Sequence, residues 1–416
     1  MFKQAKRFRD FLTTEGGRAS AITLALLLVL VARLCFVLIY RGGDFNPSGE
    51  MTSWSRIALN LVNGSGYVYD RDMPTARRGP VPVLIMAAQF WLFGPQAFPN
   101  LIVVNQWFYD VISATLIYCI VMRLFQRRWA AVLAMIIFAL HPVVIENSSR
   151  VNVEPLATCL LLAFLLAFFR ALHQPGWRRF ALSGLMLGLS IHSLSTIQFF
   201  PFVAIGFIWW CLRFGEQGKL AIVAFCLALL SVWAPWIGRN YRSLGALVPT
   251  TTLAGHNLLR DQQTLSEDDY LRFRYAEENE ANQIHLLVQQ GYDVDVISET
   301  ERDRMFRIAA LDMIRAYPDR YLILTSVRLA RLWLGLGLGS RVSLMSCVAS
   351  LVNGPLIILA LWAVVHRRQT WFRSVWLLPA LLVYGTTAYV TTVADVRYSI
   401  PFTPSMIILA CSSLIR

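Results

Sequence analysis

The chain has 416 residues, of which 56% are hydrophobic and only 15% are charged. Soluble domains carry about 25% charged residues, so this composition excludes an ordinary soluble domain and indicates a protein that lies largely in lipid. The net charge of +13 is typical of nucleic-acid-binding proteins, but here the basic residues gather beside the apolar runs. That distribution is typical of a membrane protein with basic cytoplasmic loops and excludes nucleic acid as a partner.

Several apolar runs are long enough to cross a hydrocarbon core of about 30 Å, and inside lipid such runs must be helical. The first of them, Ala21–Tyr40, is too long for a signal peptide, so we expect an anchor that follows a cytoplasmic tail at 1–20. The others are Glu154–Leu172, Leu220–Ile237, Val342–Val365 and Trp376–Val393. With shorter apolar segments included, the sequence predicts an all-α polytopic membrane protein with about 11 crossings.

Loops rich in Lys and Arg mark the cytoplasmic side of a membrane protein. This rule predicts cytoplasmic loops near 126–128, 171–179, 213–219 and 366–373, and external loops at 41–79, 146–153, 193–196, 238–319 and 394–398. The segment Pro80–Gly94 conflicts with a full crossing because it has only about 15 residues. It is therefore either re-entrant, or a later boundary is misplaced.

Two segments differ from the spans. The pattern of Trp54, Ile57, Ala58, Leu61 and Val62 predicts a one-sided helix over 51–63 that lies in the membrane interface. The segment 238–319 contains 14 of the 25 acidic residues, all between Asp261 and Asp319, so we expect it in water. Within it, Glu299–Ala316 has helical spacing and Pro318 ends that helix.

The apolar stretch Tyr321–Leu338 carries Arg328 and Arg331 near one face, which favours an interfacial or cavity-lining helix over a full span. The predicted organisation is therefore a tail at 1–20, a transmembrane module at 21–237, an external hydrophilic segment at 238–319, and a C-terminal part at 320–416. That last part begins with the Arg-bearing helix.

The first external loop holds the candidate catalytic residues. Glu50 stands directly before the one-sided helix, whose positive end favours the ionised carboxylate, and a carboxylate fixed there suits a general base. Asp44 is its rival in the same loop. Arg77 and Arg78 suit a lipid-linked phosphate, because guanidinium groups match phosphate oxygens. The simpler alternative is that Glu50 only caps the helix and the arginines contact lipid headgroups.

Further candidate binding residues stand at other predicted membrane boundaries: Arg150, Glu154, Arg239, Asn240, His256, Arg397 and Tyr398. Each has an alternative without function. Glu154 begins a helix before a proline, the arginines and tyrosine fit an interfacial belt, and His256 fits a solvated loop. All seven cysteines lie in apolar runs, and no HxxxH, CxxC, GxSxG or P-loop pattern occurs. Metal, serine-nucleophile and nucleotide sites are therefore not predicted.

The order of these motifs resembles that of the GT-C membrane glycosyltransferases, in particular the protein-mannosyltransferase and aminoarabinose-transferase-like group (glycosyltransferase family 39-like). The resemblance covers nearly the whole chain, and its strength lies in order and spacing rather than in any single motif. It is carried by Glu50, Trp54, Ala58, Asn60, Leu61, Gly64, Gly66 and Tyr67, by Arg78 and Pro80, by Ser149, Arg150, Glu154, Pro155 and Leu156, by Pro235, Trp236, Arg239, Asn240 and Tyr241, and by Arg397, Tyr398 and Pro401.

The resemblance implies a GT-C fold and transfer of a sugar from a polyprenyl-phosphate carrier to a protein, lipid or glycan acceptor. It places the reaction on the non-cytoplasmic face of a bacterial inner membrane, with no metal or other cofactor. By analogy, Glu50 activates the acceptor and the arginines hold the carrier phosphate. Three departures stand out: Glu50 replaces the family's usual Asp, Gly79 replaces a proline, and His192–Ser195 replaces a Thr-Arg-Pro motif.

A rival interpretation is a non-catalytic transporter or an assembly component for lipids or glycans. Transporters favour inverted repeats with broken helices at the membrane midplane. We find no such repeat in the sequence, and the polar residues gather near one predicted membrane face.

Overall fold

The computed structural model describes residues 15–40, 52–69, 73–213, 215–268, 270–271, 282–285, 287–288, 297–336, 344–367 and 373–415. These residues are almost entirely helical, and their only β pairing is an isolated bridge between Val68 and Pro74. The predicted all-α class is therefore confirmed.

The first half of the chain forms a bundle of helices of very different lengths. Its elements are α2 (Glu15–Cys35) continued by the π-helical turn η1 (Phe36–Tyr40), α3 (Thr52–Val62), α4 (Pro80–Phe93), the 3-10 turn η3 (Pro95–Ala97), α5 (Asn100–Phe125), α6 (Arg128–Ala139), α7 (Pro142–Ser148), α8 (Glu154–His173), α9 (Trp177–Ser193), the 3-10 turn η4 (Ser195–Ile197), α10 (Phe200–Leu212) and α11 (Glu216–Leu244).

The second half of the chain begins with the hydrophilic segment and then adds further helices to the bundle. Its elements are α12 (Ala254–Gln262), α14 (Glu299–Ala316), α15 (Pro318–Leu334), α16 (Leu344–Arg367), the 3-10 turn η6 (Arg373–Trp376), α17 (Leu377–Val390), the 3-10 turn η7 (Val396–Ser399) and α18 (Thr403–Ser413). The predicted helix Glu299–Ala316 is confirmed, and Pro318 begins the next helix. The one-sided helix predicted over 51–63 is α3, which buries Trp54, Ile57 and Ala58.

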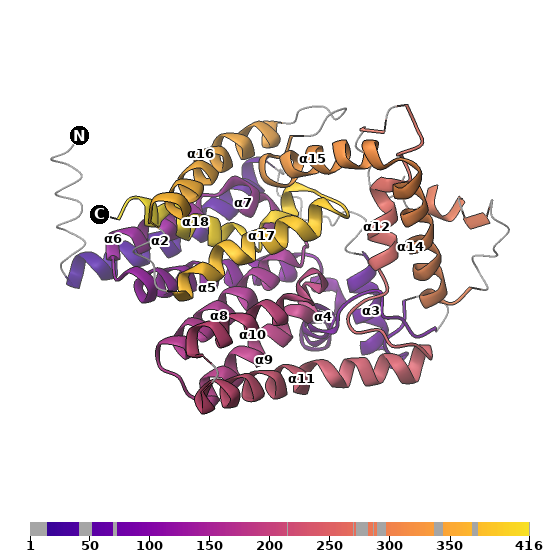
Figure 1. The fold of residues 1–416 in the computed structure, drawn as a ribbon, viewed down its shortest axis with the longest axis horizontal. Coiled ribbons are helices and arrows are strands. Elements are labelled where there is room, and N and C mark those ends of the chain that lie inside the picture. The colour runs from indigo at the N-terminus through magenta and orange to yellow at the C-terminus, as the bar shows by residue number, and fades with distance from the viewer. Residues whose placement is uncertain are drawn as a thin grey trace.

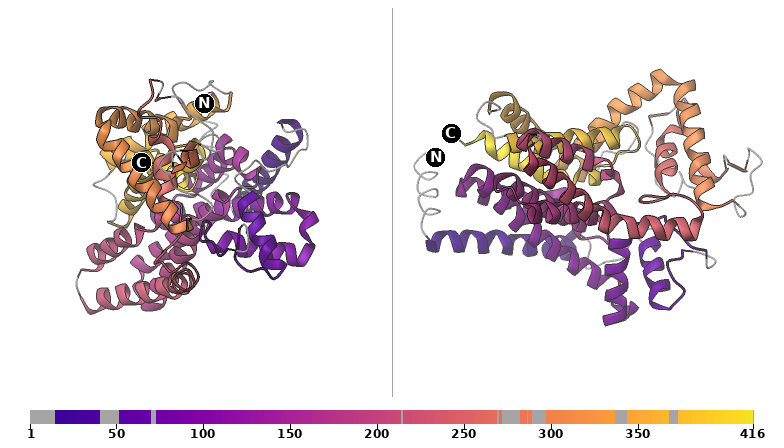
Figure 2. Two further views of the ribbon diagram at one scale, coloured as in Figure 1. Left: turned by 90° about the vertical axis from the view of Figure 1, so that its right-hand side faces the viewer. Right: turned by 60° about the horizontal axis from the view of Figure 1, so that its bottom comes forward.

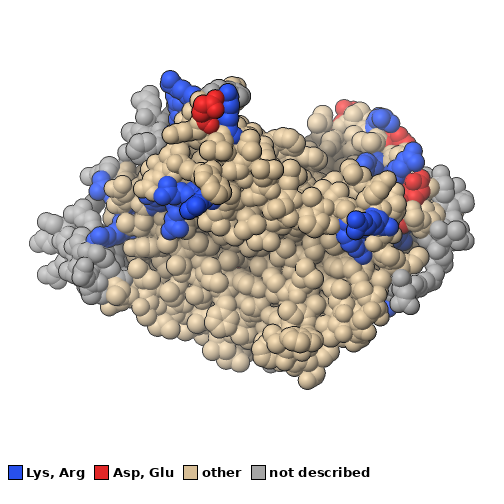
Figure 3. Space-filling view, turned by 90° about the horizontal axis from the view of Figure 1, so that it is seen from below, with Lys and Arg blue, Asp and Glu red and all other residues tan. Residues whose placement is uncertain are grey.

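Different elements lie at the two ends of the molecule's long axis (Figure 1). The start of α2 and the end of α18 lie at one end, whereas α3, α12 and α14 lie at the other (Figures 1 and 2). The long helix α11 runs along the bundle from the first end to the second. On the face shown in Figure 3, charged side chains gather near the two ends, and the wide region between them carries none. That arrangement is the one expected of a bundle that crosses a bilayer.

Five described helical segments are long and apolar enough to cross a membrane: Ile22–Ile39, α5, α8, α11 and Ser346–His366. A sixth span is possible if α6 and α7, which bend by 54° at their junction, count as one. The chain is thus a multi-pass membrane protein. The apolar helix α4 has 14 residues and reaches only about 21 Å, which explains why Pro80–Gly94 conflicts with a simple crossing. The number of about 11 crossings remains a prediction.

Aromatic side chains and glycines hold the centre of the bundle together. Phe168 of α8 packs edge-on against Phe180 of α9 and Phe225 of α11, and all three are fully buried. A Cβ on Gly184 would lie 2.2 Å from the carbonyl oxygen of Phe225, so only glycine allows α9 to approach α11 this closely. Small residues at helix contacts are the usual means of close packing in membranes.

Candidate functional site

The described residues stop short of the predicted catalytic carboxylates. Asp44 and Glu50 lie outside the described residues, as do Asp70 and Asp72. The description resumes at Thr52, where α3 begins two residues after Glu50.

Arg78 contacts the beginning of α3. Its guanidinium carbon lies 3.7 Å from the ring centroid of Trp54, and its Nε donates a 2.8 Å hydrogen bond to the Ser53 hydroxyl. Trp54 and Ser53 are buried. Because a cation stacked on an aromatic ring is held in orientation as well as in place, Arg78 is fixed beside the start of the helix that Glu50 precedes.

Tyr67 and Arg239 connect the segment after α3 to the end of α11. The Arg239 guanidinium donates to the carbonyl oxygens of Thr75 (2.6 Å) and Tyr67 (2.9 Å). The Tyr67 hydroxyl donates to the carbonyl oxygen of Arg78 at 2.8 Å. Burial raises the pKa of the Tyr67 phenol, and the nearby Arg239 and Arg78 offset this only in part. Tyr67 therefore stays protonated and serves as a hydrogen-bond donor to the arginine segment.

Glu299 joins the first loop to the hydrophilic segment. Its side chain accepts hydrogen bonds from the Thr75 hydroxyl (2.6 Å), the Ala76 amide (3.0 Å) and the Thr252 hydroxyl. Glu299 lies in the first turn of α14, where the helix dipole favours its negative charge. The first external loop and the hydrophilic segment are thus in direct contact.

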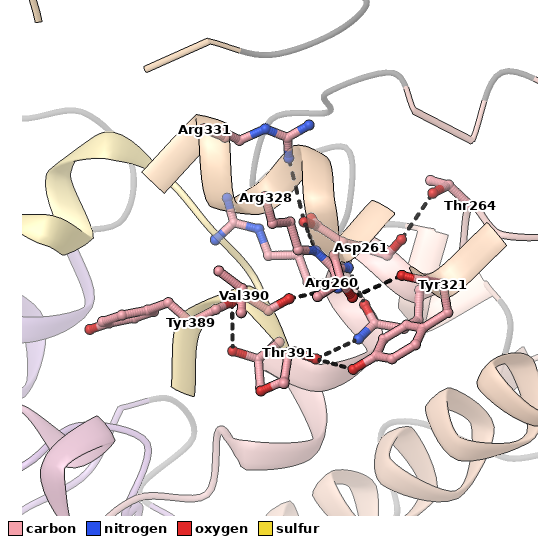
Figure 4. A network of polar contacts seen from close by, with 12 residues as sticks. Arg260, Asp261, Thr264, Tyr321, Arg328, Arg331, Tyr389, Val390 and Thr391 are labelled. Atoms are coloured by element: carbon pink, nitrogen blue, oxygen red, sulfur yellow. Dashed lines mark hydrogen bonds and ion pairs between the residues drawn. The ribbon is translucent and has the colours of Figure 1, made fainter. Parts of the chain in front are cut away.

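Four arginines from three segments gather beside α12: Arg260 of α12, Arg328 and Arg331 of α15, and Arg397 of η7. Arg328 donates to Asp261 (Nε to Oδ2, 3.1 Å) and to Gln262 (Nη2 to Oε1, 2.7 Å), and Arg331 lies 3.5 Å from the same Asp261 oxygen (Figure 4). We call these four residues the guanidinium cluster. Three of its members, Arg260, Arg328 and Arg331, are at least nine-tenths buried.

The hydroxyl of Tyr398 connects two members of the cluster. It accepts hydrogen bonds from Arg260 Nη1 and from Arg397 Nη2, each at 3.2 Å. The Tyr398 ring stacks on Tyr389, with 4.9 Å between centroids and 8° between planes. Glu154 is buried and, like Arg397, acts electrostatically on Tyr389.

Carboxylates lie among the arginines of the guanidinium cluster. Within the described residues, Asp261 pairs with Arg328 and Arg331, and Asp395 also acts electrostatically on Arg331. Burial lowers the pKa of Arg331, as do Arg328 and Arg260, whereas Asp261 and Asp395 raise it. Desolvated positive charge of this kind is costly, so an anion that enters the cluster gains more than it would at an exposed surface.

The other predicted residues fall into separate environments. Asn240 is buried and donates to the carbonyl oxygen of Val248, which is a structural role. His256 lies on α12, with its ring 6.1 Å from that of Phe306. Arg150 is 44% exposed and ion-paired with Glu146 at 2.7 Å. The structure brings Arg397 and Tyr398 together and places Arg77 and His256 in the lining of one pocket. Arg239 contacts the same loop as Arg77 through the Thr75 carbonyl, whereas Arg150 shares no contact with either group among the described residues.

Residues that the sequence did not single out as ligands complete both groups. Arg328 and Arg331 drew notice as polar positions in an apolar helix, and the prediction of a cavity-lining helix fits their burial. Arg260 and Glu299 gave no signal, because a charged residue in a hydrophilic segment is expected in water. Only contacts with distant parts of the chain distinguish them from their neighbours.

Residues 77–236 match the family model described as dolichyl-phosphate-mannose-protein mannosyltransferase. No curated protein sequence matches the chain. Among solved structures, the oligosaccharyltransferase of Archaeoglobus fulgidus in its apo form is similar over 97% of this chain and 50% of its own, at 14% identity and a TM-score of 0.60. The same enzyme, AglB, in complex with an inhibitory peptide and a dolichol-phosphate, matches over 94% of this chain and 50% of its own, at 13% identity and a TM-score of 0.55.

A structure of ArnT from Cupriavidus metallidurans bound to undecaprenyl phosphate covers 97% of this chain and 78% of its own, at 11% identity and a TM-score of 0.39, which is too low to bear on the fold. The chain spans about half the length of the archaeal enzyme. The likeness to that enzyme confirms the GT-C fold that the order of motifs predicted.

Proposed function

We propose that this protein is a GT-C glycosyltransferase that moves a sugar from a polyprenyl-phosphate carrier to an acceptor on the non-cytoplasmic face of a bacterial inner membrane. The observation that carries the proposal is the guanidinium cluster, four arginines from α12, α15 and η7, of which three are buried. The matching family model and the dolichol-phosphate complex of the structural neighbour support the same class of donor.

The chemistry of such a donor suits the cluster. A polyprenyl-phosphate sugar is a phosphodiester with one negative charge, and the departing carrier phosphate gains a second charge as the glycosidic bond breaks. Groups that bind the developing charge more strongly than the initial charge lower the barrier. In this proposal Arg397, Arg331 and their neighbours hold the phosphate, and the Tyr398 hydroxyl keeps Arg260 and Arg397 in place.

The base in this proposal is Glu50, with Asp44 as its rival. It takes the proton of the acceptor hydroxyl or amine as the acceptor attacks the anomeric carbon. The contact of Arg78 with Ser53 and Trp54, three and four residues after Glu50, supports a positively charged group beside the base. Such a neighbour favours the ionised carboxylate that a base requires.

The orientation follows from charge. The basic residues Arg213 and Lys219 flank the start of α11, and α11 leads from there to the end that holds α12 and α14. Because short basic loops stay in the cytoplasm, the end with the cluster faces outward in this proposal. The division into a transmembrane module, an external segment at 238–319 and a C-terminal part is proposed on the same basis, although α11 itself extends to Leu244.

The proposal can be tested with purified protein in nanodiscs. We expect native mass spectrometry to detect bound undecaprenyl phosphate and not undecaprenol, and Arg397→Gln to weaken that binding. Arg315→Gln is the matched control, because Arg315 is exposed and pairs only with Asp312 within the described part of the chain. Sugar transfer from undecaprenyl-phosphate donors to a membrane extract is then measured for wild type, Glu50→Gln and Asp44→Asn.

Loss of transfer in Glu50→Gln with donor binding retained is the expected result. Full turnover by Glu50→Gln would remove this residue from the mechanism, and full loss in Asp44→Asn alone would give the role to Asp44. If wild type binds no polyprenyl phosphate and transfers no sugar, the proposal is wrong, and the non-catalytic transporter or assembly component becomes the better interpretation.

A further inference from the structure

An ion pair lies inside the apolar part of the bundle and shares no residue with the guanidinium cluster. Arg33 Nε lies 2.9 Å from Asp110 Oδ2, and both side chains are fully buried. Arg33 Nη1 also donates to the carbonyl oxygens of Val29 (3.1 Å) and Ala139 (2.6 Å). The two charges stand on Ile22–Ile39 and on α5, which are both long and apolar enough to cross a membrane. Ionisable residues at such a depth are costly, so they indicate a site rather than simple packing.

The break between α6 and α7 brings further polar groups to this pair. The two helices bend by 54° at their junction, and the Ala139 carbonyl that accepts from Arg33 ends α6. The buried His141 follows, with its Nε2 2.8 Å from Asn353 Oδ1 of α16. Asn353 Nδ2 donates to the Trp333 carbonyl oxygen at the end of α15. Irregular backbone within a membrane is tolerated only where protein or water covers it.

Five buried polar atoms around this break have no hydrogen-bond partner within the described part of the chain: Arg33 Nη2, Gln106 Nε2, Gln106 Oε1, His141 Nδ1 and Asn147 Oδ1. The four side chains are all more than nine-tenths buried. Gln106 stands one turn before Asp110, on the same face of α5. Asn147 adjoins Ser148, whose hydroxyl lies beside Asp110. The unpartnered atoms therefore surround the Arg33–Asp110 pair.

These atoms need hydrogen bonds from another molecule. A buried polar group left without a bond costs more than a typical intramolecular hydrogen bond gains, and folded proteins have little stability to spare. The atoms also set the chemistry of that molecule, because Arg33 Nη2 and the Gln106 amide nitrogen donate while the Gln106 and Asn147 oxygens accept. An anion would face these oxygens, and a metal ion would face the Arg33 guanidinium. Water fits, because it donates and accepts at once.

We propose that bound water molecules bridge Gln106 and Asn147 to the Arg33–Asp110 pair, and so form a hydrated site inside the membrane-spanning bundle. A buried water typically makes about three hydrogen bonds, and the groups beside the helix break supply both kinds of partner. The water keeps the charged pair solvated where lipid surrounds the protein. The site needs neither donor nor acceptor substrate, so it stands whether or not the protein transfers a sugar.

Radiolytic hydroxyl-radical footprinting of the full-length protein in nanodiscs tests the site, because radicals formed from bound water label the side chains next to it. His141 is the reporter and is 1% exposed. Phe168 is the control, since it is equally buried but packs among the rings of Phe180 and Phe225. We expect His141 to be labelled at least tenfold faster than Phe168. Equal labelling of the two residues overturns the proposal.

Thermal unfolding of Gln106→Leu gives a second, independent test, because its sign depends on water. If water binds the amide, leucine leaves that water and its other partners short of bonds, and the midpoint falls by about 2–4 °C. If the amide is dry, leucine removes an unpaired group and the midpoint rises, which also overturns the proposal. Asn105→Leu is the matched control, because the neighbouring Asn105 amide already donates to the Tyr109 hydroxyl. A fall in Gln106→Leu with His141 unlabelled would show that the polar atoms bond to each other, and would equally count against water.

Discussion

The Thr75 hydroxyl donates a 2.6 Å hydrogen bond to Glu299, across 224 positions of sequence. Together with the bond from the Ala76 amide, it ties the loop that carries Arg77 and Arg78 to the start of α14. The arginine segment and the hydrophilic segment therefore form one structural unit at the polar end of the bundle.

Glu299→Gln should loosen this junction, because an amide replaces one of the two acceptor oxygens with a donor that faces other donors. We expect a loss of about 1–3 kcal/mol in stability and faster cleavage by protease within 238–319. Thermal unfolding and limited proteolysis measure the two effects. Glu301→Gln, two residues further along α14, is the control because the Glu301 side chain pairs with the exposed Arg304. Equal behaviour of the two variants would contradict the assigned role.

Gly79→Ala should destabilise the protein by about 1–3 kcal/mol, because a Cβ at this position would lie 2.1 Å from the carbonyl oxygen of His192. Gly206→Ala is the matched control, since nothing lies within 4 Å of its Cβ and alanine favours the helix. The readout is the midpoint of thermal unfolding in nanodiscs. Two departures from the family pattern, at Gly79 and at His192, thus meet at one contact, and a tolerated alanine at 79 would refute this account.

The buried pair of Arg33 and Asp110 should be costly to break from one side. Arg33 Nε lies 2.9 Å from Asp110 Oδ2, both side chains are fully buried, and Arg33 Nη1 also donates to the Ala139 carbonyl oxygen. We expect Asp110→Asn to lower stability by about 3–5 kcal/mol. The double variant Arg33→Met with Asp110→Leu removes both charges and should be less affected, as measured by thermal unfolding and membrane yield. A double variant worse than Asp110→Asn would argue against the pair.

Tyr398→Phe should affect donor binding more than stability. The change removes the oxygen that accepts from Arg260 and Arg397, while the ring can still stack on Tyr389. Loss of about 1 kcal/mol corresponds to a KM for the polyprenyl-phosphate donor raised about fivefold. Tyr384→Phe removes a tyrosine hydroxyl that donates to the Thr196 carbonyl oxygen and has no contact with the four arginines among the described residues, so it should leave this KM unchanged. Equal effects of the two variants would remove Tyr398 from the proposed donor site.

Local patterns in the sequence predicted the helices well. The spacing of apolar residues and the residues that flank it predicted α3 and α14 within a residue or two of their observed bounds. Pro318 marked the boundary between α14 and α15. The order of short motifs predicted the GT-C fold. Those features depend on neighbours in the chain, on the length of apolar runs and on backbone geometry, all of which can be read from a linear sequence.

The grouping of the polar side chains could not be predicted in this way. Arg260, Arg328 and Arg397 come from α12, α15 and η7, which are far apart in the sequence, and only packing shows that they share one cluster while Arg150 lies apart. By itself, the sequence determined that this chain lies in a membrane as helices, because burial of apolar runs follows from composition. The tertiary structure decided which charges meet, because a charge–charge contact depends on distance in space and not on separation along the chain.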